Sequence, residues 1–457
     1  MGRSISPPAT CAASKRLSRT QHLLDAPILT AIARLAAPGL VLALFQTAVS
    51  IADTHFVGRL GTDSLAGLAL VFPLVMLLQM TSAGAMGGGV SSAVARALGG
   101  GNEAAARRLV VHAFIIALAV GLAFTALFLL LGAPLYRLLG GSGGALAQAI
   151  AYSEVLFAGA VLVWLANTFA AALRGSGNTA LPAAVLAVTS VAQIGLSGAL
   201  TLGWAPFPAL GIRGAATSYV AAFGLAAAAM GVAIWGGALR PRAGDWRLEW
   251  RLFREILRVG ALSSLSSLQT VLTAVVLTGC VGAFGTAALA GYGVGVRLEL
   301  LQVPVVFAIG QALVVLIGTS IGAGQRSRAK RIAWAGTACA MAVSLAIGVA
   351  AALFPAAWVG IFSDDPGVLA TGGLYLRVVA PFYILFAAGM ALYFAAQGAA
   401  RVGLPILAGT ARLVAVVGGG LVVIALGAPL VALFAVIAAG MVLYGALSAA
   451  AVRRAAW

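Results

Sequence analysis

Residues 57–67 read VGRLGTDSLAG, and residues 281–291 read VGAFGTAALAG. Seven of the eleven positions are identical. Both segments separate long apolar stretches of the chain. A segment that returns after so long an interval predicts a protein built from two copies of one large structural unit.

The register of this repeat persists along the chain. It shifts once, by a single-residue gap, and is then held as far as Pro182 in the first copy and Pro405 in the second. Chance similarity is common between Gly- and Ala-rich segments, but a constant register over this length is hard to obtain by chance. The other aligned positions are ARRL at 106–109 with AKRI at 329–332, Tyr152 with Tyr375, and Gly175 with Gly398.

The composition identifies the solvent of this chain as lipid. Of its 457 residues, 62% are hydrophobic and 9% are charged, and the mean hydropathy is +1.07. So few charged side chains cannot cover the surface of a water-soluble protein of this length. Because lipid offers the backbone no hydrogen-bond partners, apolar runs of ~20 residues or more must be helices. We therefore predict an all-α, polytopic membrane protein with twelve spans, near 28–56, 64–95, 109–134, 146–173, 180–203, 211–238, 255–282, 287–320, 333–357, 368–396, 404–426 and 430–451.

The positive residues are unevenly distributed between the two ends of these spans. With the N-terminus inside, the cytoplasmic segments hold 21 of the 28 Lys and Arg residues, whereas the opposite loops hold only Arg59, Arg137 and Arg213. Since Lys and Arg collect on the cytoplasmic side, this pattern predicts a multi-pass protein of the cell (inner) membrane with both termini in the cytoplasm. It also argues against nucleic acid as a partner, because the formal net charge of +17 forms no stripe with interleaved aromatic residues.

The repeat and the charge pattern divide the chain into four parts. We predict a disordered cytoplasmic tail at 1–27, an N-terminal six-helix lobe (N-lobe) at 28–238, a charged cytoplasmic linker at 239–254 and a C-terminal six-helix lobe (C-lobe) at 255–457. The two copies are six spans apart, an even number, so they share one orientation across the membrane. The expected architecture is a parallel repeat, with two pseudosymmetric lobes around a central cavity.

A series of short motifs follows the spans in a distinctive order. They are Asp53 with FVGRLG at 56–61, GGGN at 99–102 with Arg107, LRGSGNT at 173–179 with Pro182, GIRGAA at 211–216, and FSDDP at 362–366. In these motifs the chain resembles the multidrug and toxic compound extrusion (MATE) family over nearly its whole length from Ile28, in particular the branch of the DNA-damage-inducible protein F. This resemblance implies a cation-coupled antiporter that exports hydrophobic, often cationic compounds by alternating access.

Asp53 is the residue to which the resemblance assigns ion coupling. An acid inside the membrane is costly unless it is paired, protonated or facing water. Gln46 and Ser50 precede it by seven and three residues, so they share its helix face and are candidates for a polar network. Desolvation favours the neutral acid, which would let Asp53 load a proton outside and release it inside. The alternative is an interfacial aspartate that reaches the outer headgroups.

The residues that assist this acid in proton-coupled relatives are replaced in this chain. An Asn and an Asp on the fifth helix correspond best to Gln193 and Ser197, and a Tyr one turn before the acid corresponds to Val49. Gln193, Ser197 and Asn167 are candidates for a pocket shared with Asp53. Buried polar side chains in membrane helices also commonly serve only to join neighbouring helices.

The coupling ion is a further expectation from the resemblance. Sodium-coupled relatives carry acids on the seventh and tenth helices, where this chain has Gln269 and Phe386. Asp53 itself falls opposite Leu277 in the repeat, so only the N-lobe keeps the titratable residue. We therefore expect H+ as the coupling ion, with Na+ less favoured, and an ion site in the N-lobe.

Four charged residues fall within or near predicted spans of the C-lobe: Arg297, Glu299, Arg377 and Arg412. Arg297 and Glu299 are two residues apart, about 200° around a helix, so they cannot pair directly. Glu299 would either attract a cationic substrate or neutralise Arg412 or Arg377. The three arginines keep open an alternative function, a flippase for lipids or lipid-linked oligosaccharides of the same superfamily, whose cavity must hold a pyrophosphate.

The sequence argues against a membrane-embedded enzyme. Three scattered histidines and few acids supply no converging nucleophile, base or metal ligands. Cys11, Cys280 and Cys339 fit neither a metal spacing nor a disulfide framework. We expect a transporter with no catalytic residues, no metal site and no cofactor besides its coupling ion, which acts on small molecules as a monomer in the lipid bilayer.

Overall fold

The structure is a computed structural model that describes residues 20–454. All regular structure in this range is helical, which confirms the all-α class. The N-lobe consists of α2 (Ile28–Gly58), α3 (Thr62–Gln79), the π-helical η1 (Met80–Met86), α4 (Gly87–Gly99), α5 (Glu103–Leu138), α6 (Gly143–Ala158), α7 (Ala160–Gly175), α8 (Ala180–Leu202) and α9 (Ile212–Trp235).

The C-lobe repeats this arrangement after a linker that contains the 3-10 helix η2 (Ala243–Trp246). Its helices are α10 (Trp250–Gly282), α11 (Thr286–Gly322), α12 (Arg326–Leu353), α13 (Pro355–Val359), α14 (Pro366–Val379), the 3-10 helix η3 (Ala380–Phe382), α15 (Tyr383–Gly398), α16 (Gly403–Ala425) and α17 (Leu430–Arg454).

The number of spans agrees with the prediction. Eleven helical segments within residues 20–454 are long and apolar enough to cross a membrane, and α6 with α7 makes a twelfth that is bent by 50°. The bend falls at Gly159, where a side chain would collide with Val220 of α9. A glycine at this position therefore lets the bent span and α9 approach closely.

Each lobe packs around its own apolar core. Trp164 and Phe157 are fully buried in the N-lobe, and Tyr375 and Phe434 are almost fully buried in the C-lobe. Apolar side chains such as Leu130, which is 76% exposed, cover the outside of the molecule. This distribution fits a surface solvated by lipid, where an exposed leucine costs nothing.

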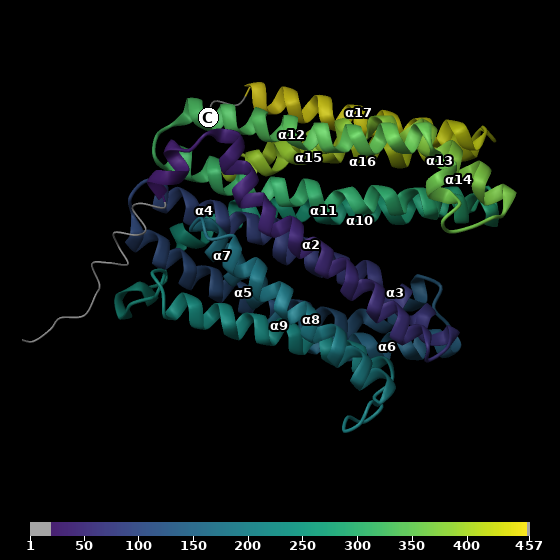
Figure 1. Ribbon diagram of the computed structural model, residues 1–457, viewed down its shortest axis with the longest axis horizontal. Helices are drawn as coiled ribbons and strands as arrows, with labels where there is room; N and C mark the ends of the chain where they lie inside the picture. Colours follow the sequence, from purple (N-terminus) through teal and green to yellow (C-terminus); the bar gives the residue numbers. More distant parts are fainter. Residues whose placement is uncertain (1–19, 455–457) are drawn as a thin grey trace, which may run out of the picture.

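The two lobes meet at one end of the molecule. Figure 1 shows their ribbons close together at the end that holds the start of α2 and the end of α17, and diverging toward the other end. At the closed end, Arg96 Nη2 of α4 donates to Glu255 Oε1 of α10 at 3.1 Å, and Arg96 Nη1 donates to the Gly398 carbonyl of α15 at 3.5 Å. Gln397 Nε2 donates to the Gly84 carbonyl of η1 at 3.4 Å. These contacts join the lobes across the pseudosymmetry axis.

Close backbone contact reinforces this closure. A Cβ on Gly99 of α4 would collide with the Thr319 carbonyl of α11, and a Cβ on Gly322 of α11 would collide with the Arg96 carbonyl of α4. In the register of the repeat, Gly99 and Gly322 are counterparts, as are Arg96 and Thr319. The pseudo-twofold axis therefore passes between the ends of α4 and α11, and glycine is required on both sides of it.

The first helix of each lobe crosses into the other lobe at this end. The first turns of α2 carry Ala31 and Ile32 into a core with Ile309 of the C-lobe. In return, Leu252 and Ile256 of α10 pack in the N-lobe core. The sequence boundaries at residues 28 and 255 thus divide the chain, but the N-terminal ends of these two helices each pack in the opposite lobe.

The predicted disordered tail is wrong in its last part. Residues 20–25 are helical, and Leu23 is buried against the C-lobe. Arg328 Nη2 of α12 donates to the carbonyls of Leu23 at 3.2 Å and Ala26 at 2.6 Å. These contacts order the segment that precedes α2. Residues 1–19 lie outside the described part of the chain.

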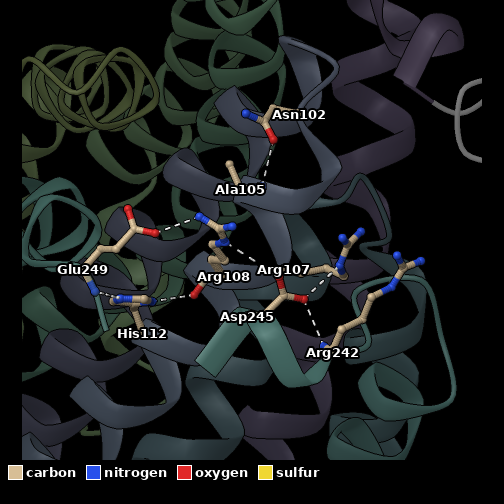
Figure 2. A network of polar contacts seen from close by, with 8 residues as sticks. All are labelled: Asn102, Ala105, Arg107, Arg108, His112, Arg242, Asp245 and Glu249. Atoms are coloured by element: carbon tan, nitrogen blue, oxygen red, sulfur yellow. Dashed lines mark hydrogen bonds and ion pairs between the residues drawn. The ribbon is translucent and has the colours of Figure 1, made fainter. Parts of the chain in front are cut away.

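The predicted linker is also too long, because α10 begins at Trp250 rather than at residue 255. The linker is docked on α5 by the polar network in Figure 2. Buried Asp245 accepts from Arg107 Nε at 3.1 Å, and Arg108 Nη1 donates to Glu249 Oε1 at 2.7 Å. His112 Nε2 accepts from the Glu249 amide at 2.9 Å. The linker is therefore held against the N-lobe.

Candidate functional site

Asp53 lies in the half of α2 that is farther from the termini, where α2 packs along α8. Its Oδ1 accepts from Ser197 Oγ at 2.5 Å, and its Oδ2 accepts from Gln193 Nε2 at 3.2 Å. Ser197 and Gln193 are four residues apart, so one face of α8 presents both donors. Within residues 20–454 Asp53 forms no ion pair. The carboxyl group is thus bonded by two neutral donors and turns toward α8.

Gln46 and Ser50 are exposed on α2 and are not bonded to Asp53. Their spacing places them on the same side of the helix as Asp53, with Ser50 one turn and Gln46 two turns toward the N-terminal end of α2. Val49, which stands where relatives carry a Tyr, is buried. The contact network of Asp53 therefore comes from α8, and the predicted partners on α2 only extend the polar face.

Asn167 of α7 belongs to a second polar network. Its Nδ2 donates to Gln79 Oε1 at 3.0 Å and to Ser82 Oγ of η1 at 2.8 Å. Gln79 Nε2 in turn donates to Tyr219 Oη of α9. Asp53 is close enough for its charge to act on Tyr219, but no hydrogen bond joins the two networks in the described part of the chain. Asn167 is therefore near the Asp53 site and separate from it.

Sequence reasoning missed Gln79 and Tyr219. Gln79 is a lone amide in an apolar helix, and its repeat counterpart is Gln302, so the repeat carried a signal for this position. The π-helical turn of η1 brings Ser82 to Asn167, and such turns are frequent at functional sites. No sequence pattern predicts this π-helical turn.

In the C-lobe, the structure separates the four predicted charges. Glu299 Oε2 accepts from Tyr375 Oη at 2.9 Å, and the charge of Arg412 acts on Glu299, although the two form no ion pair within the described residues. Arg297 instead lies over the ring of Phe362 at 5.1 Å. Arg377 is exposed, and neither it nor Arg297 pairs with Glu299 in residues 20–454. The sequence offered Arg412 and Arg377 as alternatives to neutralise Glu299, and Arg412 is the one whose charge acts on it.

Comparison with known proteins decides the family. A family model described as MatE matches the chain twice, over residues 38–197 and over residues 263–422. The chain belongs to the MatE family of transporters. The two matches also confirm the internal repeat, since one model fits each lobe.

MatE proteins of known description are similar over most of their length. The chain is 28% identical to a FAD transporter of Shewanella oneidensis, over 81% of this chain and 84% of that protein. It is 31% identical to a probable multidrug resistance protein NorM of Deinococcus radiodurans, over 78% and 79%. With a probable NorM of Thermotoga maritima it shares 26% identity, over 80% and 79%.

Solved structures of MatE transporters share the fold. A MOP superfamily transporter from Pyrococcus furiosus, described as having a binding pocket of reverse polarity, superposes with a TM-score of 0.86 at 25% identity, over 94% of this chain and 96% of that chain. The outward-facing conformation of a multidrug resistance MATE transporter gives a TM-score of 0.84 at 25% identity, over 94% and 96%. These similarities confirm the two-lobed, twelve-span architecture of a multi-pass membrane transporter.

Gln269 and Phe386 stand at the two positions where the resemblance places acids in sodium-coupled relatives. Gln269 Nε2 donates to Thr410 Oγ1 at 2.8 Å, which joins α10 to α16. Phe386 lies beneath Arg412 at 4.8 Å from its ring centroid. An amide bonded to a hydroxyl and a phenyl ring under a guanidinium supply few oxygen ligands for Na+.

Proposed function

We propose that this MatE transporter is a proton-coupled antiporter that exports hydrophobic, often cationic compounds, and that Asp53 carries the coupling proton. The observation behind the proposal is that, among residues 20–454, the hydrogen-bond partners of the Asp53 carboxyl group are both neutral. A carboxylate in an ion pair would resist protonation, whereas this one can gain a proton without leaving a buried cation unpaired.

The partners of Asp53 suit both of its protonation states. The amide of Gln193 only donates to the carboxyl oxygen, and it can go on doing so when the other oxygen carries a proton. The hydroxyl of Ser197 donates to the carboxylate and can accept from the carboxylic acid after a rotation of its own proton. The site can therefore alternate between charged and neutral forms with little rearrangement of side chains.

The orientation of the chain determines which way this site opens. The distribution of Lys and Arg supports both termini in the cytoplasm, so the closed end with Arg96 and Glu255 faces the cytoplasm. Asp53 then lies in the outer half of the N-lobe, in an outward-facing conformation. In this state it is placed to load a proton from outside. One chain supplies both lobes, which supports action as a monomer.

A carrier for anionic cargo is the second candidate function, and it includes the flippase alternative. One MatE relative is a FAD transporter, and FAD carries phosphate groups. Arg412 is the observation that favours this candidate, because it lies among C-lobe side chains rather than in a loop. An accumulated lipid-linked precursor after depletion of the protein would support a flippase, and protection from ethidium-like cations would support the exporter.

The test of proton coupling is uptake of a fluorescent cation into inverted membrane vesicles that carry an imposed pH gradient. We expect Asp53→Asn to reduce gradient-driven uptake to the level of vesicles without the protein. Glu154→Gln is the matched control, because Glu154 is an exposed acid of the N-lobe with only a 3.4 Å contact to Arg213. Uptake by Asp53→Asn at the wild-type rate would refute the proposal. Uptake driven by a Na+ gradient would identify Na+ rather than H+ as the coupling ion.

A further inference from the structure

Aromatic and charged side chains converge inside the C-lobe around Arg412 of α16. Its guanidinium lies over the ring of Phe386 of α15 at 4.8 Å and over the ring of Tyr444 of α17 at 5.8 Å. Glu299 of α11, which is bonded by Tyr375 of α14, is near enough for the two charges to act on one another. Five helices thus contribute to one cluster, which we call the Arg412 cluster: α11, α14, α15, α16 and α17.

The Arg412 cluster contains a hydrogen-bonding group that has no protein partner among the described residues. Arg412 Nε is buried and unbonded. Gln302, one turn after Glu299 on α11, is 1% exposed, and its Nε2 and Oε1 also have no partner in residues 20–454. Buried polar groups are nearly always bonded, so the unbonded guanidinium nitrogen of Arg412 supports a site where another molecule binds.

The charged residues of this cluster have no charged counterparts in the N-lobe. In the register that the repeat holds here, Arg412 corresponds to Thr189, and Glu299 corresponds to Met76. Tyr375 and Gln302, in contrast, have counterparts of the same type in the N-lobe. The shared residues belong to the scaffold of both lobes, whereas the charged pair occurs only in the C-lobe. A structural requirement common to both lobes therefore does not explain Arg412.

The geometry of Arg412 determines what it can recognise. Aromatic rings flank its guanidinium and stabilise the cation, while the edge of the guanidinium carries the N–H groups. That edge matches two oxygens of a carboxylate or a phosphate. Glu299, whose charge interacts with that of Arg412, forms no ion pair with it within the described residues and accepts its hydrogen bond from Tyr375.

We propose that the Arg412 cluster is a C-lobe binding site for an aromatic compound that carries an anionic oxygen group, with Arg412 as the contact to that group. The proposal rests on the proposed export function. It extends the substrate class of that function to acidic and amphoteric molecules. Glu299 balances the charge of Arg412 when no anion is bound, and it opposes the anion when one arrives.

Two matched pairs of fluorescent probes test this proposal by anisotropy on the purified full-length protein in lipid nanodiscs. Rhodamine B and its ethyl ester differ in a carboxylate, and FMN and riboflavin differ in a phosphate. We expect Arg412→Gln to weaken binding of the acidic member of a pair about tenfold or more, the size of a charge-assisted contact. Binding of its partner without the acidic group should weaken less than about twofold. The pair that responds identifies carboxylate or phosphate as the preferred group.

Three further variants make the result specific. Arg412→Lys keeps the charge without the planar edge, so it should restore part of the lost affinity. Glu299→Gln should tighten binding of the acidic probes, because it removes a negative charge beside the anion. Arg377→Gln is the matched control, since Arg377 is an exposed arginine of the same lobe, and it should leave all affinities unchanged.

Several outcomes would overturn the proposal. The first is that Arg412→Gln weakens binding of the acidic probes and of their partners without the acidic group equally. The second is that the wild type binds neither acidic probe more tightly than its partner. The third is that neither acidic probe binds measurably. The measurement is made at equilibrium without a gradient, so Asp53→Asn should keep the preference for acidic probes. Failure of proton coupling would appear only in the vesicle uptake assay, which separates the two proposals.

Discussion

Ser197 and Gln193 hold the two oxygens of one carboxyl group from a single helix face. The bond from Ser197 Oγ to Asp53 Oδ1 is 2.5 Å long, and the bond from Gln193 Nε2 to Asp53 Oδ2 is 3.2 Å long. The shorter bond identifies Ser197 as the principal positioning residue. Since α2 and α8 touch along this face, the same bonds also fix how the carboxyl group is aimed.

Removal of the Ser197 hydroxyl should therefore impair proton-driven uptake. A hydrogen bond to a charged group contributes ~1.5–3 kcal/mol, so we expect Ser197→Ala to lower the uptake rate about tenfold. Ser197→Thr keeps a hydroxyl and should recover most of the rate. Ser190→Ala is the control, because Ser190 is also buried on α8 but forms no hydrogen bond with Asp53 in the described part of the chain. Equal rates for Ser197→Ala and Ser190→Ala in inverted vesicles would contradict this role.

Individual residues were predictable where they break the local composition. Asp53 is an acid in an apolar span, and Gln193 and Ser197 stand at helical spacing on another, so their position could be inferred. Their bonding could not, because it depends on how α8 rotates against α2. The setting of Arg412 was hidden for the same reason, since Phe386 and Tyr444 are ordinary aromatic residues until the packing places them on its guanidinium.

At the scale of elements, the linker is more than a tether between lobes. The 3-10 helix η2 buries the Asp245 carboxylate, whose Oδ2 accepts from Arg107 Nε and from the Arg242 amide. Glu249, the residue before α10, pairs with Arg108 of α5. Together these bonds attach the linker, up to the residue before α10, to α5 of the N-lobe (Figure 2).

Asp245 should be the critical residue of this attachment. Loss of one partner of a buried ion pair costs ~3–5 kcal/mol, and Asp245→Asn leaves the mostly buried Arg107 without its counter-charge. We expect tryptic cleavage of the linker in native protein to accelerate at least about tenfold. Glu249→Gln should change it less than about twofold, since Glu249 and Arg108 are 34% and 40% exposed and such pairs contribute little. Equal cleavage of the two variants would show that the linker is held by other contacts.

Element boundaries followed from the sequence only where no tertiary contact intervenes. The ends of α8 and α16 agree with the apolar runs to within a residue. The start of α10 does not, because the charged residues from Trp250 onward form a helix on the N-lobe surface rather than a loop. The helical turn at residues 20–25 was missed because its stability comes from Arg328 and the C-lobe, which lie far away in sequence.

At the scale of the whole molecule, the lobes are joined by two helix ends, one from each lobe, that pack in the opposite lobe. The repeat predicted two similar lobes and their shared orientation, and both are present. It could not predict that α2 and α10 would each pack one end in the opposite lobe, because such contacts exist only after the lobes have met. Since this exchange of helix ends lies at the closed end, the single helix α2 connects the Asp53 site with the core of the C-lobe (Figure 1).

The Arg96–Glu255 ion pair should help to keep this end closed. It joins α4 to α10 at 3.1 Å, and its side chains are 14% and 37% exposed. Arg96→Gln should open the end, since Glu255 and the Gly398 carbonyl lose their donor. The measurement is the distance between spin labels on cysteines that replace Ala104 and Ser327, exposed repeat counterparts in a cysteine-free background.

The charge-reversed pair separates electrostatic closure from simple damage. Arg96→Glu alone places two acids together and should shift the label distances toward a longer, open population. Adding Glu255→Arg restores an attractive pair in the same place, and it should recover part of the short-distance population as a positive coupling in a double-mutant cycle. If the double variant is as open as the single one, the Gly99–Thr319 and Gly322–Arg96 backbone contacts hold the end closed without the ion pair.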